Sequence, residues 1–139
     1  MSQDCMYCAR DERLTNLMIE VAPMRVSTLY LFREQTYRGR CIVALNDHER
    51  ELFQLSPEAQ ESYLRDIAQA AKAVHTAFAP DKINYGAFGD MMPHVHFHIV
   101  PKYKDGYTWG KMFEMNPAGN EQLSDAEYEE IIARLRAAL

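Results

Sequence analysis

Three histidines at alternate positions are the residues of this 139-residue chain whose type and spacing point to chemistry. They are His94, His96 and His98, and single apolar residues separate them. Because the side chains of a β-strand point alternately to its two faces, the three imidazoles are predicted to share one face and the apolar residues to face the core. The imidazole face must meet water, a polar cleft or a ligand, since buried imidazoles need hydrogen-bond partners.

Imidazoles in this arrangement support two kinds of chemistry. A neutral imidazole is available near pH 7 because its ordinary pKa is about 6.5, and it can attack phosphorus to form a covalent intermediate that water then opens. The flanking imidazoles and backbone N–H groups would then hold the phosphate charge in the transition state. Alternatively, His94 and His96 are ligands of a catalytic zinc, although the sequence offers no clear third ligand or activating Glu nearby. The alternation with apolar residues disfavours a chance surface cluster or an affinity-tag remnant.

Periodicity and turn residues predict the elements that must position these histidines. Ser56 and Pro57 suit the start of a long helix that ends near Pro80. Ser124 and Glu127 match a capping box at the start of a final helix, which continues to the end of the chain. The order of elements predicts an α+β fold with a mainly antiparallel sheet, one long helix and a C-terminal helix. Strands are predicted over 16–21, 26–32, 40–45, 82–88 and 95–100, and a long functional loop over 102–119.

Size and charge exclude several classes of protein. The length fits one domain over residues 1–139, and the shares of 47% hydrophobic and 25% charged residues are those of an ordinary globular protein. A net charge of −5 argues against duplex nucleic acid or an anionic membrane as a partner. No stretch approaches the roughly 20 apolar residues of a membrane span, and residues 1–13 have no apolar signal core. We therefore expect a cytoplasmic protein with reduced thiols.

The segment Pro93–Val100, which reads PHVHFHIV, resembles the H-φ-H-φ-H-φ-φ signature of the histidine triad (HIT) superfamily. The resemblance extends over most of the chain, including the strand order, the long helix and the N-terminal cysteines. It implies a HIT-like fold in a homodimer. It also implies an enzyme that cleaves or transfers a nucleotide at the α-phosphate of a nucleoside phosphoramidate or a dinucleoside polyphosphate, with no cofactor required for the chemistry.

The resemblance also implies roles for individual residues. His96, the middle histidine, matches the nucleophile of the family and would carry the nucleotidyl intermediate. His98 would contact the phosphate, and His94 would complete the catalytic triad. Asn84 matches an asparagine that lies near the ribose and phosphate.

Two departures from the family pattern affect the expected activity. Asp90 and Met91 stand where many relatives have a glutamine and a hydroxyl residue. A carboxylate beside a phosphate weakens binding unless it is protonated or meets a cation. A nucleotide-binding protein with little turnover is therefore an alternative function. Arg40 stands where relatives often have a histidine, and two interpretations stay open: a phosphate-binding fork, or a solvated arginine at the start of a strand.

Other polar residues are weaker candidates for substrate contacts. Glu34 lies near the position where relatives keep an acid or amide for ribose hydroxyls, but an exposed carboxylate at a strand end is the commoner explanation. Lys102 and Lys104 follow the histidine strand and can pair with distal phosphates. Trp109 can stack on a base or close the dimer. Solvated lysines and a core tryptophan are the alternatives.

Cys5 and Cys8 form a C-x₂-C pair, which by itself is a weak signal for a metal. Many bacterial HIT proteins have a similar pair, and the resemblance implies a Cys₂His₂ structural zinc site completed by His48 and His94. Two reduced surface thiols beside an incidental His48 are the alternative. The third cysteine, Cys41, lies in a predicted strand and is expected to be a small core residue.

Overall fold

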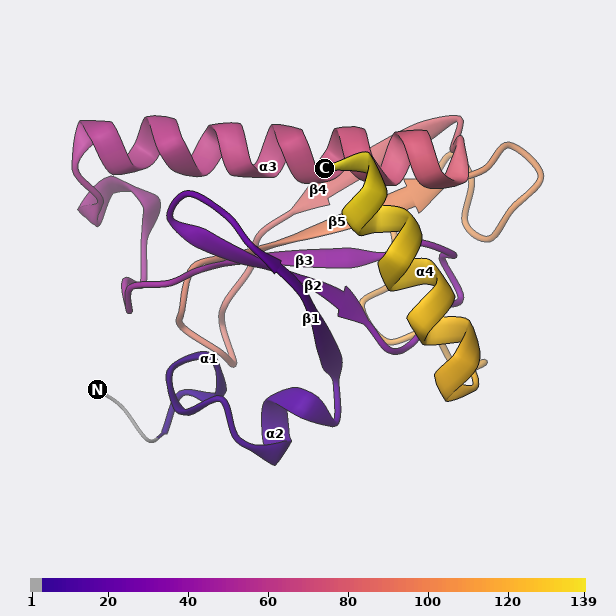
Figure 1. Ribbon diagram of the computed structural model, residues 1–139, viewed down its shortest axis with the longest axis horizontal. Helices are drawn as coiled ribbons and strands as arrows, with labels where there is room; N and C mark the ends of the chain where they lie inside the picture. The colour runs from indigo at the N-terminus through magenta and orange to yellow at the C-terminus, as the bar shows by residue number, and fades with distance from the viewer. Residues whose placement is uncertain (1–3) are drawn as a thin grey trace.

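An antiparallel sheet of five strands forms the centre of the computed structural model, which describes residues 4–139 (Figure 1). Residues 1–3 of the predicted domain lie outside the described part. The strand order is β1-β2-β3-β5-β4, so β4 lies at one edge and β5 lies between β3 and β4. The strands are β1 (Met18–Pro23), β2 (Ser27–Phe32), β3 (Cys41–Leu45), β4 (Lys82–Gly86) and β5 (His96–Lys102). The predicted α+β class is confirmed.

Two long helices lie on one side of this sheet, and short N-terminal helices lie on the other (Figure 1). The long helices are α3 (Pro57–Phe78) and α4 (Asp125–Ala138), and the short N-terminal ones are α1 (Met6–Ala9) and α2 (Glu12–Thr15). A 3-10 helix, η1 (Leu52–Gln54), precedes α3. Both predicted helix starts are confirmed, because the Ser56 side chain accepts a hydrogen bond from Ala59 N and a capping box joins Ser124 and Glu127. The short helices were not predicted, because four residues are too few to show a helical period. Among residues 4–139 no helix combines the length and apolarity needed to cross a bilayer.

The sheet separates two hydrophobic cores, as the alternation of side chains along its strands requires. The larger core lies under α3 and α4 and takes alternate strand residues such as Leu29, Val43 and Ile99. The smaller core lies under α1 and α2 and takes the residues between them, including Tyr30 and Ile42. The second face is covered by the short N-terminal segment and by the loop after β5, and it is the face that carries the histidines of β5.

The strand register decides which residues surround these histidines. His96 is paired with Ala44 of β3, and His98 lies between Ile42 of β3 and Gly86 of β4. Asn84 of β4 is paired with Val100, which has the same orientation as His98 on β5. Asn84 thus shares the histidine face, two residues further along the sheet.

A buried carboxylate fixes α3 to the turn between β1 and β2. Asp66 of α3 is fully buried and accepts hydrogen bonds from the backbone N–H groups of Arg25 and Val26 and from the Ser27 hydroxyl. The Arg25 guanidinium adds a contact of 3.1 Å. These bonds satisfy the buried charge that would otherwise be costly, and they hold the long helix at a defined position on the sheet.

Candidate functional site

The three histidines form a row of buried imidazoles at the start of β5. β5 begins at His96, so the predicted strand start at residue 95 is one residue early and His94 precedes the strand. The ring centroids of His96 and His98 are 5.5 Å apart. The Tyr7 ring of α1 lies 5.0 Å from His96 and 5.2 Å from His94. His96 is the most exposed of the three, with 9% of its surface accessible.

His96 has its proton on one defined ring nitrogen. Its Nδ1 lies 2.6 Å from the carbonyl oxygen of His94, and because a carbonyl only accepts, Nδ1 must carry the hydrogen. Nε2 of His96 therefore keeps its lone pair. Burial lowers the pKa of His96, and the bond to the His94 carbonyl partly opposes that shift. The ring is accordingly a neutral imidazole with a nucleophilic Nε2.

His98 has the opposite tautomer. Its Nδ1 lies 3.1 Å from Nη2 of Arg40, and a guanidinium can only donate, so Nδ1 accepts and Nε2 carries the hydrogen. Burial lowers the pKa of His98 to about 3, with further lowering by the charge of Arg40 and then by His96. A nucleophilic nitrogen on His96 and an N–H donor on His98 are thus carried by neighbouring rings. Attack on a phosphate needs both groups, because the first bonds to phosphorus and the second stabilises the negative charge that develops on a phosphate oxygen.

Arg40 is fully buried, so the interpretation as a solvated arginine is wrong. Its guanidinium lies over the Phe32 ring at 4.2 Å and near the Phe113 ring at 5.4 Å, and it donates to the carbonyl of Met115 at 3.1 Å. Burial lowers its pKa to about 10, although the charge of Glu34 acts in the other direction. The Arg40 side chain therefore connects His98 to the loop after β5, and its hydrogen bond to Nδ1 fixes the orientation of the His98 ring. Phosphate binding by Arg40 itself stays a prediction.

Glu34 is buried as well, so it is not an exposed carboxylate at a strand end. Its oxygens accept hydrogen bonds from the backbone N–H of Thr36, from the Thr36 hydroxyl and from Glu121 N. The residue lines a cavity of about 260 Å³ together with Phe32 and Asn120. The Phe32 ring also lies 6.0 Å from His98, so this cavity adjoins the imidazole row.

Asn84 and Trp109 line another cavity, of about 310 Å³, whose wall includes Lys102. Trp109 is 40% exposed, so it is not a core tryptophan. Lys102 is only 3% exposed, so it is not a solvated lysine either, whereas Lys104 is exposed as the alternative expected. Asp90 is also exposed, in the segment between β4 and β5, and its predicted proximity to the phosphate stays a prediction.

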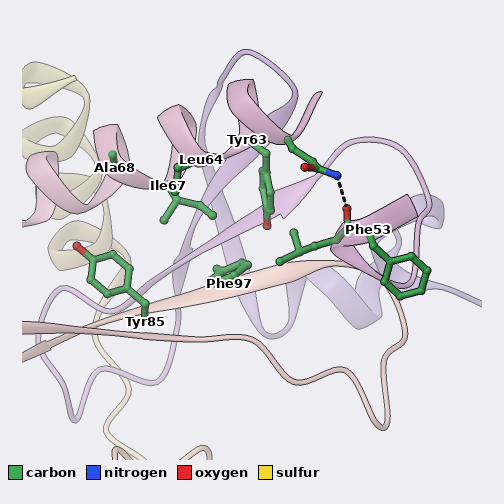
Figure 2. A pocket seen from close by; sticks show the side chains of 9 residues that line it. Phe53, Tyr63, Leu64, Ile67, Ala68, Tyr85 and Phe97 are labelled. Carbon is green, nitrogen blue, oxygen red and sulfur yellow. Dashed lines mark hydrogen bonds between the residues drawn. The ribbon is translucent and has the colours of Figure 1, made fainter. Parts of the chain in front are cut away.

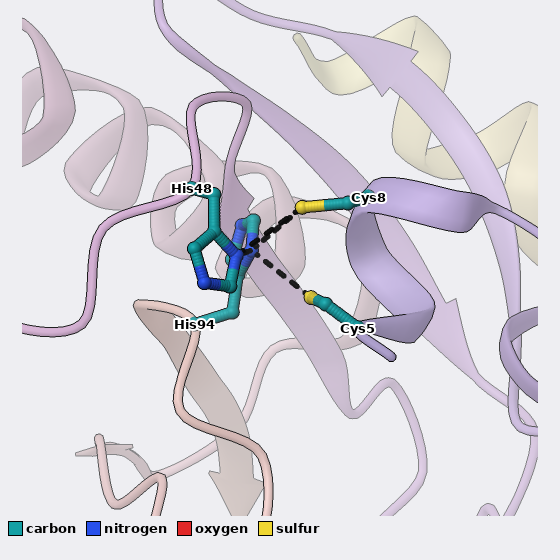
Figure 3. Close-up of side chains that lie close together, drawn as sticks. All are labelled: Cys5, Cys8, His48 and His94. Atoms are coloured by element: carbon teal, nitrogen blue, oxygen red, sulfur yellow. Dashed lines mark hydrogen bonds between the residues drawn. The ribbon is translucent and has the colours of Figure 1, made fainter. Parts of the chain in front are cut away.

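The four predicted zinc ligands meet in space, and Figure 3 shows their side chains converging from α1, the segment after β3 and the segment before β5. Their ligand atoms all lie within 4.8 Å of one another. Nδ1 of His94 is 3.3 Å from Cys5 Sγ and 3.6 Å from Cys8 Sγ, and Nδ1 of His48 is 3.2 Å from Cys8 Sγ. We call Cys5, Cys8, His48 and His94 the Cys–His cluster.

The geometry of the Cys–His cluster fits a tetrahedral zinc ion. Zinc bonds of about 2.0 Å to nitrogen and 2.3 Å to sulfur place neighbouring ligand atoms about 3.3–3.8 Å apart. The histidine tautomer also fits, because Nε2 of His94 lies 2.6 Å from the Leu45 carbonyl and must carry the hydrogen, which leaves Nδ1 free to bind a metal. His96 is outside this cluster. The alternative of two surface thiols is wrong, because Cys5 is buried and Cys8 is partly buried.

Two aromatic residues of the site were missed by sequence reasoning. Tyr7 covers His94 and His96, and Phe113 lies 6.0 Å from His98. The position of Tyr7 inside the C-x₂-C pair was a usable signal, because any cluster that joins these cysteines to His94 brings Tyr7 to the same place. Phe113 lies in an irregular loop, where no periodicity indicates its direction.

The largest of the described cavities is not at the histidines. It is an apolar groove of about 690 Å³ between α3 and the strands β4 and β5, on the opposite face of the sheet (Figure 2). Phe97 and Tyr85 form its floor, while Leu64 and Phe53 lie at its border and are largely exposed. The groove contains none of the three imidazoles, so we assign it no part in the chemistry.

Comparisons with known proteins agree with this architecture. The chain is 28% identical over 123 residues to Adenosine 5'-monophosphoramidase hnt1 of Schizosaccharomyces pombe, an alignment that covers 85% of this chain and 89% of that protein. The crystal structure of a histidine triad (HIT) protein from Sinorhizobium meliloti 1021 has a TM-score of 0.84 at 22% identity, with 93% of this chain and 95% of that chain covered.

A second solved structure, of a Zn-bound histidine triad family protein from Mycobacterium smegmatis, has a TM-score of 0.63 at 21% identity and covers 99% of this chain and 94% of that chain. At these identities the two structures show a shared fold. A family model for the HIT domain matches residues 27–105, which is more than half of the chain and includes the histidine strand. Fold, histidine strand and family match therefore lead to one conclusion: this chain belongs to the histidine triad (HIT) family.

Proposed function

We propose that this protein is a nucleotide hydrolase or transferase that acts at the α-phosphate of a nucleoside phosphoramidate or dinucleoside polyphosphate. The observation that carries the proposal is the pair of opposite tautomers, with a lone pair on Nε2 of His96 and a hydrogen on Nε2 of His98. The phosphoramidase named among the relatives, which is 28% identical, supports the same reaction class.

In this mechanism Nε2 of His96 attacks the α-phosphorus and the bond to the leaving group breaks. The nucleotidyl-imidazole that results is positively charged, and the hydrogen bond from its Nδ1 to the His94 carbonyl stabilises that charge. His98 donates from Nε2 to a non-bridging phosphate oxygen as negative charge develops there. Water then cleaves the bond between nitrogen and phosphorus, which releases a nucleoside monophosphate and restores His96.

The cavity beside Phe32 is our candidate for the nucleoside. A carboxylate has about four lone-pair positions, and the protein occupies three of those on Glu34, so one remains for a ribose hydroxyl. Asn84 lies on the histidine face between the imidazoles and the loop after β5, where it can donate to a phosphate oxygen.

Structural zinc in the Cys–His cluster is part of this proposal. The residues Cys5, Cys8, His48 and His94 would hold it, and it would connect α1 to the segment before β5. Tyr7 would then be held over His96, which limits water at the nucleophile. The alternative function as a zinc-dependent hydrolase needs His96 as a ligand, whereas His96 is outside the Cys–His cluster.

We also propose that the protein forms a homodimer through the apolar groove of Figure 2. The adjoining strand β4 is a sheet edge whose outer backbone groups have no strand partner among the described residues. An apolar patch next to such an edge is typical of an association surface, and two copies related by a two-fold axis can pair both features at once. Leu64 and Phe53 would be covered in such a dimer.

The decisive experiment is detection of the covalent intermediate. The protein is incubated with an adenosine phosphoramidate or a diadenosine polyphosphate, quenched in a way that preserves phosphoramidate bonds, and mapped by mass spectrometry. We expect an adenylyl group on His96, and loss of both adduct and turnover in His96→Ala. His75→Ala is the matched control, because His75 is an exposed histidine on α3. Normal turnover by His96→Ala would refute the mechanism.

Asp90 and Met91, in place of a glutamine and a hydroxyl residue, keep a second function open: nucleotide binding with little turnover. Binding of an adenine nucleotide, with no product from either the adenosine phosphoramidate or the diadenosine polyphosphate, would favour this second function.

A further inference from the structure

The loop after β5 supplies the partners that orient Arg40, although residues 103–124 form neither helix nor strand. The carbonyl oxygens of Glu114 and Met115 accept hydrogen bonds from Nη1 of Arg40 at 3.4 and 3.1 Å, while Nη2 of the same guanidinium lies 3.1 Å from Nδ1 of His98. Because a guanidinium is a planar fork, the direction of one N–H group fixes the direction of the others. The contact with His98 therefore depends on where the loop holds the two carbonyls.

Tyr37 fixes this loop at two points. The residue is buried, with 2% of its surface accessible, and it lies in the connection between β2 and β3. Its hydroxyl oxygen accepts a hydrogen bond from the backbone N–H of Glu114 at 2.8 Å, and the hydroxyl forms a second hydrogen bond of 2.8 Å with the Thr108 hydroxyl. One phenol group thus holds Glu114, whose carbonyl contacts Arg40, and a second position six residues earlier in the loop.

The connection that carries Tyr37 is itself held by a buried side chain. Gln35 is 1% exposed, accepts a hydrogen bond from Gly39 N at 2.8 Å, and donates to the carbonyl oxygens of Phe32 at 2.6 Å and Arg40 at 3.2 Å. The backbone N–H of Arg40 also donates to the Tyr37 carbonyl at 3.0 Å. Tyr37 and Arg40 therefore belong to one hydrogen-bonded turn, and the loop is fixed relative to both of them.

The backbone of Thr108 shows that the loop is held in a conformation that it would not adopt alone. Thr108 has a φ of 55°, and among residues 4–139 it is the only β-branched residue with a positive φ. Such a conformation persists only where surrounding contacts enforce it. Tyr37 binds the side chain of Thr108, and the buried ammonium group of Lys102 donates to its carbonyl at 2.9 Å. Loss of either bond should therefore let this part of the loop relax.

The held loop also forms the surroundings of His98. Phe113 precedes Glu114, and its ring lies 6.0 Å from the His98 ring and edge-on to the Tyr37 ring at 6.5 Å. The ring packs closely on β4, because a Cβ atom at Gly86 would lie only 2.8 Å from it. Movement of the loop would therefore change both the aromatic cover of His98 and the carbonyl partners of its guanidinium neighbour.

We propose that Tyr37 is a positioning residue for the reaction: its hydroxyl holds the loop after β5 where the loop carbonyls orient Arg40, and Arg40 in turn keeps the hydrogen of His98 on Nε2. Among the described residues Tyr37 forms neither a hydrogen bond nor a ring contact with an imidazole, so it acts through Arg40. The inference rests on the proposed function, because it takes Nε2 of His98 as the donor to the phosphate.

Tyr37→Phe tests the proposal, because it removes the hydroxyl and keeps the buried ring. Nitrogen-15 chemical shifts of the histidine rings, measured without substrate, should change from a single tautomer of His98 to a mixture. For an adenosine phosphoramidate, kcat should fall about three- to tenfold, the effect of one neutral hydrogen bond, while KM stays unchanged. A merely structural role would change neither the tautomer of His98 nor kcat in the folded protein.

Tyr103→Phe is the matched control. The Tyr103 hydroxyl donates to the Arg38 carbonyl at 2.8 Å, so it joins the same loop to the same turn but contacts neither Glu114 nor Thr108. We expect this variant to have a lower Tm, a wild-type kcat and one tautomer of His98.

The other end of the hydroxyl pair gives a second test. Thr108→Val removes the hydroxyl at constant shape and should also lower kcat, whereas Thr108→Ser, which keeps the hydroxyl, should recover most of that loss. The double variant Tyr37→Phe/Thr108→Val should lose no more activity than Tyr37→Phe, because the bond between the two hydroxyls is already absent there.

Two results would overturn the inference. One is an unchanged single tautomer of His98 in Tyr37→Phe, or in Thr108→Val if Tyr37→Phe does not fold. The other is an equal loss of kcat in Tyr37→Phe and Tyr103→Phe, because general loosening of the loop would then explain both. Absence of an adenylyl group on His96 would instead overturn the proposed function, and the tautomer measurement, which needs no substrate, would keep its result.

Discussion

Replacement of Arg40 by methionine tests the tautomer argument most directly. The guanidinium forces Nδ1 of His98 to accept a hydrogen bond, and this keeps the hydrogen on Nε2. Methionine has a similar length but no donor, so His98 becomes free to move its hydrogen to Nδ1. The Nε2 donor that faces the phosphate is then lost in part of the population.

The expected magnitude follows from the type of bond that is removed. A hydrogen bond with a charged donor contributes about 1.5–3 kcal/mol, and if the transition state depends on it, kcat falls roughly 10- to 150-fold. The change in stability should be smaller. Arg40 is a buried charge whose Nε has no hydrogen-bond partner, and replacement of such a charge by an apolar side chain is often close to neutral, so we expect at most about 2 kcal/mol.

Two measurements check this prediction. Nitrogen-15 chemical shifts of the histidine rings should show an unprotonated Nδ1 on His98 in the wild type and a mixture of tautomers in Arg40→Met. Single-turnover kinetics give the loss in the chemical step, and Arg38→Met is the matched control, because Arg38 is a half-exposed arginine two residues away. A protonated Nδ1 on His98 in the wild type would refute the reasoning, as would wild-type kcat in Arg40→Met.

Four further predictions concern metal, stability, assembly and pH. Metal analysis should find one zinc ion per chain in the Cys–His cluster. A strong chelator should lower Tm at concentrations that leave binding of AMP intact, because the cluster connects α1 to the sheet and is separate from the nucleophile. Asp66→Asn should lower the free energy of unfolding in urea by about 2–4 kcal/mol, since several buried donors lose their charged acceptor, and a loss below about 1 kcal/mol would contradict this. Leu64→Glu should convert the homodimer to monomers in light scattering, and a dimer that persists would exclude the groove as the interface. The folded-state pKa of His98 is below its unfolded value of about 6.5, so its contribution to stability is complete above that pH and declines as the pH falls toward 3. Because the charge of Arg40 lowers this pKa in addition to burial, urea titrations should show a smaller decline of the free energy of unfolding in Arg40→Met than in the wild type. An equal decline in both proteins would oppose this assignment.

Residues with a local pattern were predicted well. The alternation of His94, His96 and His98 placed the imidazoles on one side of a strand, and the Ser124 capping box marked the start of a helix, because both patterns depend on neighbours within a few positions. The boundaries shifted by one or two residues where a neighbouring element intervened. Strand β1, for example, begins at Met18 rather than residue 16, because α2 and its cap occupy the preceding residues.

Residues whose environment depends on distant segments were predicted poorly. An exposed carboxylate at a strand end was the commoner explanation for Glu34, and a solvated arginine was one of two open interpretations for Arg40. Instead, the loop that follows β5 covers Arg40, and Glu121 N bonds to Glu34. Trp109 was considered for the core and is half exposed, whereas Lys102 beneath the same loop is buried. Polar residue types favour the surface on average, so composition and periodicity gave no signal for these exceptions.

The sequence by itself therefore determined the imidazole row, the α+β class and the family, because each follows from the order of residue types along short stretches of chain. Only the tertiary structure decided the tautomers. Arg40 and His98 are 58 positions apart, and their contact at 3.1 Å exists because β3 pairs with β5 in one register. A hydrogen bond depends on the position of its atoms to within a few tenths of an ångström, and no local pattern in a sequence carries that information.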